Sequence, residues 1–329
     1  MAENLVLGTW NIREFDSTKY GLRDMECLLY IAEIIDCFDL VAVQEVREDL
    51  TALNRLLDYL GGWWKCLITD VTLGRRGNDE RMAFLFDSRK ITFGGLASEV
   101  VIPPQQEGNK KYNPAEQLAR TPYMVGFRAG WFKFTICTTH ILYGTDAAED
   151  PDRVKEIQLL AQFLADEASN KFAWSKNMIL LGDFNIFKPE DQTMKAITDA
   201  GFVVPKQIQK LPSNVAQNKH YDQIAFIASD IEDDLELAKA GVFNFFNYVY
   251  RDEDEAAYAE AMGKKYADKP DASKKRRYYR DWRTYQMSDH LPMWVELKID
   301  FSKRYLQKKL DQQLRAADTA RFIIANNAM

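Results

Sequence analysis

Short apolar runs recur along this chain, and several of them end abruptly in polar side chains. In the clearest case four apolar residues, Met178–Leu181, precede the sequence GDFN at positions 182–185. A run of this length that ends at a glycine predicts a strand buried on both faces. Side chains two residues apart in an extended chain point the same way, so Asp183 and Asn185 should emerge together. Many α/β proteins place their chemistry at such strand ends, although an ordinary Asx-capped turn is an equal reading of this sequence alone.

Further apolar runs predict the rest of the fold. Strands are expected over residues 5–13, 40–43, 63–68, 82–86, 124–128, 131–138, 224–227 and 291–297. Helical spacing of apolar residues predicts helices over residues 22–38, 49–60, 150–168 and 194–200. The order is neither strict strand–helix alternation nor all-β. It fits an α/β fold in which two mixed sheets pack as a two-layer sandwich flanked by helices.

The composition changes between residues 241 and 285. An acidic run, Asp252 to Glu255, precedes a basic aromatic run, Lys274 to Arg283. We interpret residues 241–285 as a partly helical surface insertion in a domain that spans residues 1–300, followed by a charged helical tail over 301–329. The basic aromatic run is either a solvated face or a surface that stacks bases and tracks phosphates.

The overall composition limits the class of protein. Hydrophobic residues make up 47% of the chain, and the net charge is −6. A negative net charge argues against a protein that coats nucleic acid nonspecifically, but it permits a local basic groove. The four cysteines lack CxxC or zinc spacing, so buried free thiols and a reducing compartment are expected. The start of the chain lacks the features of a signal peptide, and no apolar stretch is long enough to span a membrane. A cytoplasmic location is therefore expected, with secretion left open if a leader precedes this chain.

Polar residues that could take part in catalysis or metal binding lie beside the predicted strands. They are Asn11, Glu45, His140, Asp183, Asn185, Asp222, Asp289 and His290. Each alone has a structural explanation, because carboxylates cap helices and single histidines are usually satisfied surface or core residues. Six strand-edge clusters together favour a shared site.

The residue types in this set point to one kind of reaction. Asn11, Glu45 and Asp289 offer hard oxygen ligands, which suit Mg²⁺, Mn²⁺ or Ca²⁺ better than zinc. The chain has no HExxH, Walker A, GxGxxG or GxSxG motif. A hard metal with two histidines suits phosphodiester hydrolysis. The metal draws charge from a phosphoryl oxygen, and a histidine with a carboxylate partner activates water or protonates the leaving oxygen.

Six motifs that contain these residues occur in a fixed order: TWNIREF, AVQEVRE, TTHI, LLGDFNI, YDQI and SDHLP. Together they resemble the endonuclease/exonuclease/phosphatase superfamily, and within it deoxyribonuclease I most closely. The resemblance covers Leu5 to about Asp230 and returns at Met287 to Leu297. It implies a two-sheet α/β sandwich with the site at one edge.

The resemblance also implies roles for individual residues. Glu45 would be the main metal ligand, with Asn11 and Asp289 nearby. Asp183 and Asn185 would position and activate the attacking water.

Two histidine pairs complete the implied site. His290 oriented by Asp222, and His140 oriented by Glu80, would act as acid and base or stabilise the phosphate. Without the resemblance, Glu80 lies in a polar loop that is solvated by default.

Four arginines match positions that would meet the nucleic-acid backbone or groove: Arg13, Arg47, Arg75 and Arg120. The planar guanidinium fork suits phosphate because it binds two oxygens at once. The alternative for each is a solvated surface charge.

The chain departs from the deoxyribonuclease I pattern in several places. The groove-stacking tyrosine is replaced near Asn78, the disulfides are missing, and neither residues 241–285 nor the tail after Asp300 has a counterpart. The insertion would shape the substrate site or bind a partner, and the insertion and the tail are the candidates for unknown protein contacts.

The leading hypothesis is an endonuclease that hydrolyses DNA with Mg²⁺ (or Mn²⁺, or Ca²⁺). The alternative is a phosphatase or phosphodiesterase of the same superfamily that acts on a phospholipid or nucleotide. Abasic-site repair is disfavoured by His140, where that branch has tyrosine, and inositol phosphatases are disfavoured by the sequence HYDQIAF.

Two further readings remain. Sphingomyelinases need an apolar membrane hairpin, and FNFFNYVY at residues 243–250 is the one candidate, although a core strand is expected there. A catalytically idle binding module should have lost Glu45, Asp183 or His290, and all three are present.

Overall fold

The computed structural model describes residues 4–15, 23–73, 78–103, 117–227 and 236–300, with residues 302–303, 306–307 and 309–315 of the tail. Arg75, one of the predicted substrate-binding residues, lies outside these ranges.

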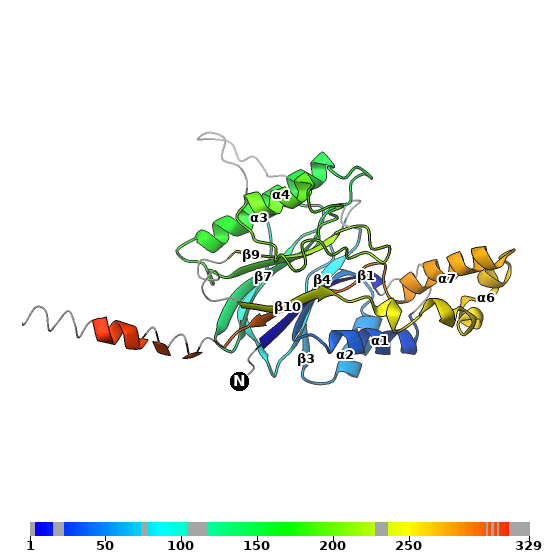
Figure 1. The fold of residues 1–329 in the computed structure, drawn as a ribbon, viewed down its shortest axis with the longest axis horizontal. Coiled ribbons are helices and arrows are strands. Elements are labelled where there is room, and N and C mark those ends of the chain that lie inside the picture. Colours follow the sequence, from blue (N-terminus) through cyan, green and yellow to red (C-terminus); the bar gives the residue numbers. More distant parts are fainter. Residues whose placement is uncertain are drawn as a thin grey trace, which may run out of the picture.

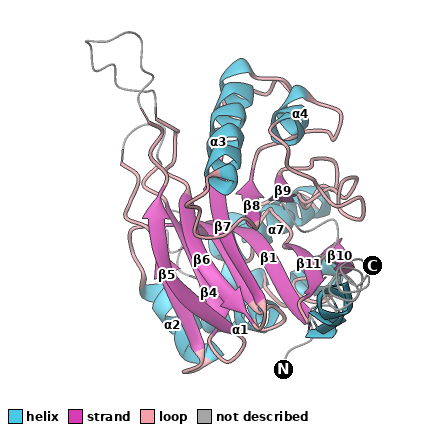
Figure 2. Ribbon diagram, turned by 90° about the vertical axis from the view of Figure 1, so that its left-hand side faces the viewer, coloured by secondary structure: helices cyan, strands magenta, loops and turns pink. Residues whose placement is uncertain are grey.

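Two mixed β-sheets form the centre of the molecule (Figures 1 and 2). In the first sheet the strand order is β10 (Glu236–Val242), β11 (Met293–Lys298), β1 (Asn4–Phe15), β2 (Leu40–Val46), β4 (Arg81–Asp87) and β3 (Trp64–Ile68). In the second it is β5 (Ile91–Glu99), β6 (Tyr123–Ala129), β7 (Phe132–His140), β8 (Met178–Asp183) and β9 (Asp222–Ile227). Only the pairs β1–β2 and β7–β8 are parallel within these two sheets.

Helices cover the outer faces of the two sheets. Helices α1 (Met25–Ile35) and α2 (Thr51–Leu60) lie on the first sheet, and α3 (Pro151–Ser169) and α4 (Gln192–Asp199) lie on the second (Figure 1). Between the sheets, apolar side chains such as Leu7, Phe84 and Leu180 are fully buried. The predicted two-layer sandwich flanked by helices is confirmed.

Some elements differ from the sequence-based predictions. The predicted core strand over residues 243–250 is wrong, because Phe245–Asn247 form a short 3-10 helix, η1. Phe245 and Phe246 are nevertheless buried, and the Phe245 ring lies 5.4 Å from that of Trp10. Strand β5 was not predicted, because most of its side chains are exposed and give no apolar run.

The insertion forms a helical arm, which we define as residues 252–286. It contains η2 (Asp252–Ala256), α6 (Ala259–Ala267) and α7 (Ala272–Gln286). The arm extends away from both sheets, on the right in Figure 1. The described residues of the tail are helical.

The four cysteines are free thiols. Cys27 and Cys137 are buried and Cys66 is half-buried, but Cys37 is exposed, so the prediction of burial is wrong for Cys37. No helix among the described residues is long and apolar enough to cross a membrane.

Candidate active site

The polar residues predicted from strand ends come together where β1, β2, β7 and β8 end. Asn11, in β1 where its register with β2 shifts, donates from Nδ2 to Glu45 Oε1 and to Asp183 Oδ2, each at 2.9 Å. Because Glu45 belongs to the first sheet and Asp183 to the second, this one amide joins the two sheets at the site.

Gly182 allows β7 and β8 to approach closely just before Asp183. Its φ is +135°, and a Cβ at this position would lie 2.1 Å from the carbonyl oxygen of Thr139. Only glycine avoids this clash with the neighbouring backbone. The GDFN motif therefore needs its glycine in order to place Asp183 beside His140, with which it is paired in register.

Asp183 lies between the two histidines. Its Oδ2 is 3.4 Å from Nε2 of His140 and 3.6 Å from Nε2 of His290. Its Oδ1 accepts a hydrogen bond from the backbone N–H of Asn185 at 2.9 Å, and Asn185 Nδ2 donates to the carbonyl of Ile141 at 2.8 Å. The local Asx turn and the shared site are thus both present.

Each histidine has the carboxylate partner that the sequence predicts. His290 Nδ1 lies 2.8 Å from Asp222 Oδ2, and His140 Nδ1 lies 2.7 Å from Glu80 Oε2. All four side chains are buried. The two Nδ1 contacts leave each Nε2 facing the Asp183 carboxylate.

The charges around His290 favour its protonated form. Burial lowers the pKa of His290, but the carboxylates of Asp222 and Asp183 outweigh it and raise the pKa well above the usual value. For His140, burial and Arg120 lower the pKa, whereas Glu80 and Asp183 raise it further, and the net shift is upward. Both shifts favour the imidazolium forms of the two histidines.

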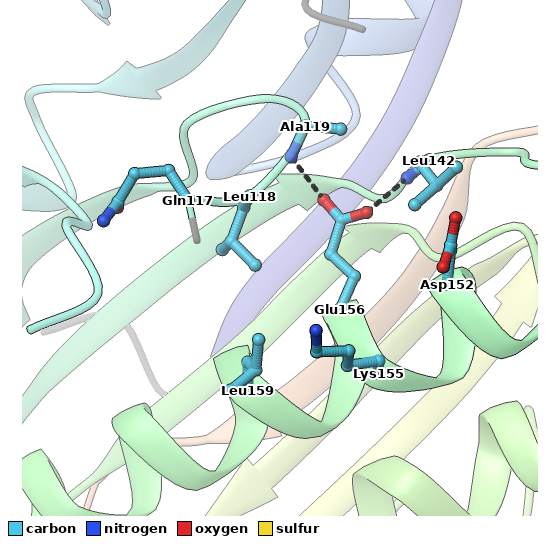
Figure 3. Close-up of a pocket in the computed structure, with 8 residues that line it drawn as sticks. All are labelled: Gln117, Leu118, Ala119, Leu142, Asp152, Lys155, Glu156 and Leu159. Atoms are coloured by element: carbon cyan, nitrogen blue, oxygen red, sulfur yellow. Dashed lines mark hydrogen bonds between the residues drawn. The ribbon is translucent and has the colours of Figure 1, made fainter. Parts of the chain in front are cut away.

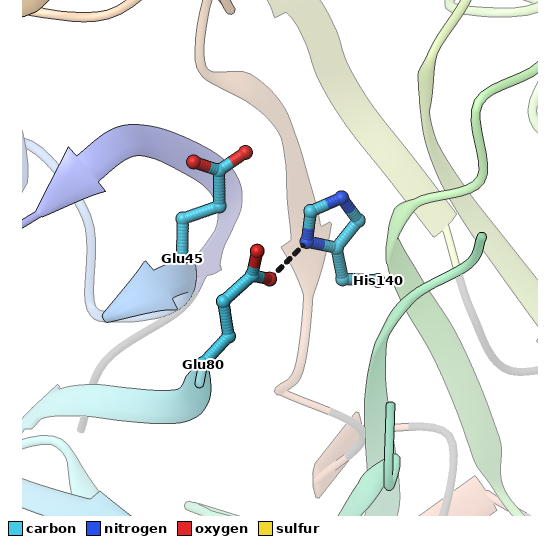
Figure 4. A group of neighbouring side chains, drawn as sticks. All are labelled: Glu45, Glu80 and His140. Atoms are coloured by element: carbon cyan, nitrogen blue, oxygen red, sulfur yellow. Dashed lines mark hydrogen bonds and ion pairs between the residues drawn. The ribbon is translucent and has the colours of Figure 1, made fainter. Parts of the chain in front are cut away.

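Glu45, Glu80 and His140 place ligand atoms within 4.8 Å of one another (Figure 4). Burial and the neighbouring Glu80 carboxylate raise the pKa of Glu45. Asn11 Oδ1 is buried and has no hydrogen-bond partner among the described residues. A cation beside Glu45 would satisfy this oxygen and offset the negative charge, and oxygen donors suit Mg²⁺ or Mn²⁺. The residues therefore fit the metal that the fold implies.

The Glu80 carboxylate forms ion pairs with basic side chains of the protein. Its carboxylate lies 2.8 Å from Arg120 Nε and 3.6 Å from Arg47 Nη2, besides its contact with His140. Burial raises the pKa of Glu80, but His140 and the two arginines outweigh it and lower the pKa to about 2. Glu80 is thus a permanently charged anchor for His140, and the expectation of a solvated loop residue is wrong.

The described arginines surround the site but are engaged within the protein. Arg47 and Arg120 are only 12% exposed, both beside Glu80. Arg13 contacts Asp289 at 3.5 Å and lies over the ring of Tyr285. Asp289, predicted as a metal ligand, is 43% exposed and lies outside the group of close ligand atoms among the described residues.

Sequence reasoning missed two residues that shape the site. Ser288 Oγ donates to the carbonyl of Asn11 at 2.6 Å and accepts from the backbone N–H of His290 at 3.0 Å, which fastens the loop carrying His290 to β1. Tyr221 stacks on the His290 imidazole, with centroids 5.3 Å apart. Tyr221 and Ser288 are the first residues of the motifs YDQI and SDHLP, and that membership was the only available signal.

A buried carboxylate on α3 holds the segments that carry Arg120 and His140. Glu156 accepts hydrogen bonds from the backbone N–H of Ala119 at 2.9 Å and of Leu142 at 3.2 Å (Figure 3). These residues line a small cavity beside the site (Figure 3). Glu156 therefore helps to position Arg120 and His140 indirectly, through hydrogen bonds to the backbone of the segments that carry them.

The chain is similar in sequence and in fold to known proteins. No protein-family model matches the chain. It is 29% identical over 204 residues to a deoxyribonuclease of Thioalkalivibrio sp., covering 60% of this chain and 51% of that protein, so it spans about half of that relative's length. It is 26% identical over 258 residues to deoxyribonuclease-1 of Bos taurus, covering 74% of this chain and 84% of that protein.

Solved structures show the same fold at lower identity. The human nocturnin catalytic domain has a TM-score of 0.58 at 14% identity and covers 90% of this chain and 95% of its own. An endonuclease/exonuclease/phosphatase family protein from Bacteroides thetaiotaomicron has a TM-score of 0.55 at 16% identity and covers 89% of this chain and 94% of its own. A mannosyl-6-phosphatase from the same organism has a TM-score of 0.54 at 15% identity, with 90% and 100% coverage.

Proposed function

Because this chain has the endonuclease/exonuclease/phosphatase fold and is similar in sequence to deoxyribonuclease I, we propose that it is a divalent-metal-dependent endonuclease that hydrolyses phosphodiester bonds in DNA. The observation that carries the proposal is the convergence of two buried histidine–carboxylate pairs on Asp183. The similarity to deoxyribonucleases favours DNA over a lipid or a small phosphate ester.

Different residues of the chain have different roles in the proposed reaction. The scissile phosphate lies between His140 and His290, whose positive charges stabilise the charge that develops on its oxygens. Asp183 accepts the proton of the attacking water, and Asn185 fixes the Asp183 carboxylate through its backbone N–H. Protonated His290, oriented by Asp222, donates a proton to the leaving oxygen.

Glu45 and the unpartnered Oδ1 of Asn11 would hold the metal ion. When bound, the ion supplies Lewis acidity to a phosphoryl oxygen. Asp289 lies close enough to Glu45 to raise its pKa, so it would support the ion from the outer side of the site.

Nicking of supercoiled plasmid with added Mg²⁺ or Mn²⁺ tests the proposal. We expect wild type to nick the plasmid, EDTA to abolish nicking, and His290→Ala to be slower by about 100-fold or more, since general acid–base catalysis contributes roughly 10²–10⁴-fold. His220→Ala is the matched control, because His220 is the one histidine in the sequence that lies outside the site.

Two outcomes would contradict the proposal. Nicking by His290→Ala at the wild-type rate would show that the assigned site is wrong. Release of phosphate or phosphocholine from a phosphoinositide, sphingomyelin or nucleotide panel, without any nicking, would move the function to the phosphatase and phosphodiesterase alternative.

A further inference from the structure

The arm ends beside the candidate active site. Its last helix, α7, ends at Gln286, four residues before His290. Arg13, at the end of β1, donates to Thr284 Oγ1 at 2.7 Å and to the Tyr285 hydroxyl at 2.8 Å. Arg23 donates from Nε to the carbonyl of Gln286 at 2.8 Å. The base of the arm is thus tied to the site by side-chain contacts.

Three arginines of the arm, Arg276, Arg280 and Arg283, form ion pairs with its own carboxylates. Asp252 pairs with Arg280 and with Arg283, and Glu255 pairs with Arg276. The acidic run of the sequence therefore faces the basic run across the arm. These arginines are not free to bind phosphates.

The aromatic residues of the arm also have partners. Tyr258 packs between Tyr250 and Trp282, with ring centroids 4.6 and 5.6 Å away, and Tyr279 is fully buried. The aromatic side of the run is therefore packed inside the arm and is not open for base stacking, whereas Lys274, Arg276, Arg277 and Arg280 lie on its exposed side.

The far end of the arm is different. We define the arm tip by its basic residues, which are Lys264, Lys265, Lys269, Lys274, Lys275 and Arg277. Four of them are exposed and have no carboxylate partner among the described residues, namely Lys264, Lys265, Lys274 and Arg277. Between residues 264 and 277 the only acidic residues are Asp268 and Asp271. On a chain whose net charge is −6, this is a local concentration of uncompensated positive charge.

We propose that the arm tip binds the phosphate backbone of DNA at a distance from the scissile bond, an inference that rests on the proposed function. The charge of the tip is complementary to a polyanion. Its lysines bind without sequence preference, because phosphate contacts carry no direct base information. The substrate is accordingly a long polynucleotide and not an isolated nucleotide or short fragment.

The length of α7 sets the reach of this contact. Its 15 residues span about 22 Å at roughly 1.5 Å per residue. A DNA strand advances about 3.4 Å per base pair along the duplex axis, so the tip reaches phosphates up to about six base pairs from the scissile bond. A duplex with shorter flanks on both sides offers the tip nothing to bind.

A charge-reversal variant and two substrate lengths test the proposal. The arm variant is Lys264→Glu, Lys265→Glu and Lys274→Glu. The control variant, Lys65→Glu, Arg128→Glu and Lys171→Glu, changes the net charge equally at exposed residues distant from the arm. The substrates are duplexes of about 30 and about 8 base pairs. Hairpin loops keep the shorter duplex paired, and a cut near its middle leaves flanks shorter than the six-base-pair reach.

We expect the arm variant to cleave the long duplex about tenfold or more slowly in kcat/KM at low salt, and the short duplex at the wild-type rate. The slope of log activity against log salt concentration should be shallower for the arm variant by about 2 to 3. Each lost phosphate contact removes about 1 from this slope. The control variant should match wild type on both substrates.

Equal losses on the two lengths, equal losses in the arm and control variants, or no loss at all would overturn the arm proposal while leaving the nuclease intact. A failure of the proposed function looks different, because wild type itself would then cleave neither duplex, and that result would remove both proposals.

Discussion

Asp183 is the residue on which the hydrogen bonds and charges of the site converge. Its two oxygens contact Asn11, Asn185 and both histidines. The histidines in turn depend on carboxylates behind them, Glu80 for His140 and Asp222 for His290. At the scale of single residues, the proposed catalysis therefore depends on the protonation state of each imidazole.

Replacing Asp222 by Asn should lower the pKa of His290. The Asp222 carboxylate is the main group that raises this pKa against the effect of burial, and a neutral amide lacks the negative charge that stabilises the imidazolium. In metal-free protein, the NMR titration of the His290 ring should move to lower pH in Asp222→Asn. His220 is the internal control, because burial lowers its pKa and Asp222 does not contribute to that shift. An unchanged His290 titration would refute the assigned pair.

The same raised pKa links protonation to stability. A His290 pKa above that of the unfolded chain stabilises the folded protein fully below the unfolded value, and this contribution is lost as pH rises through the folded value. Burial raises the pKa of Asp222, so at strongly acidic pH its carboxyl is protonated and the pair is lost. Asp222→Asn should therefore weaken stability most at pH values between the folded-state pKa of Asp222 and that of His290, and less on either side of this range.

Most of the site residues were predictable because strand ends are readable from apolar runs. Glu45, His140, Asp183 and Asp222 all follow or begin such runs. Glu80 was not readable in this way, since its burial comes from Arg47, Arg120 and His140, three partners from separate segments. Ion pairs between residues that are distant in the sequence cannot be predicted from the residues next to Glu80.

At the scale of elements, the close approach of β7 and β8 is what places Asp183. The sequence signal for β8 was strong because both of its faces are buried. The signal for β5 was absent because most of its side chains are exposed. The apolar run at residues 243–250 predicted burial correctly but not the local backbone, because a 3-10 turn and a strand can bury the same phenylalanines.

Gly182→Ala should destabilise the protein and lower its activity. The added Cβ would lie 2.1 Å from the Thr139 carbonyl oxygen, at a residue with φ of +135°. Backbone strain and overpacking together should cost about 3 kcal/mol or more, which urea unfolding would measure. Gly62→Ala is the matched control, because its Cβ meets nothing within 4 Å. Equal unfolding free energies of the two variants would contradict the argument.

At the scale of the whole molecule, the site lies where the two sheets meet, and its groups come from both. Asn11 and Glu45 belong to the first sheet, and His140 and Asp183 to the second. The helical arm adds a third body that is tied to the same place through Arg13. The sequence indicated the insertion by its change in composition, but its internal ion pairing depends on how two runs separated by about 20 residues fold onto each other.

Because the proposed metal site draws on groups that join the two sheets, Mg²⁺ should stabilise the entire domain. A ligand that binds only the folded state adds RT ln(1 + [L]/Kd), or about 2.7 kcal/mol at 100 times Kd, which should raise the melting temperature by several degrees. Glu45→Gln should abolish this rise, whereas Glu33→Gln, an exposed carboxylate on α1, should retain it. NaCl at equal ionic strength separates binding from screening. A rise that persists in Glu45→Gln would place the ion elsewhere, even if both variants still required metal for nicking.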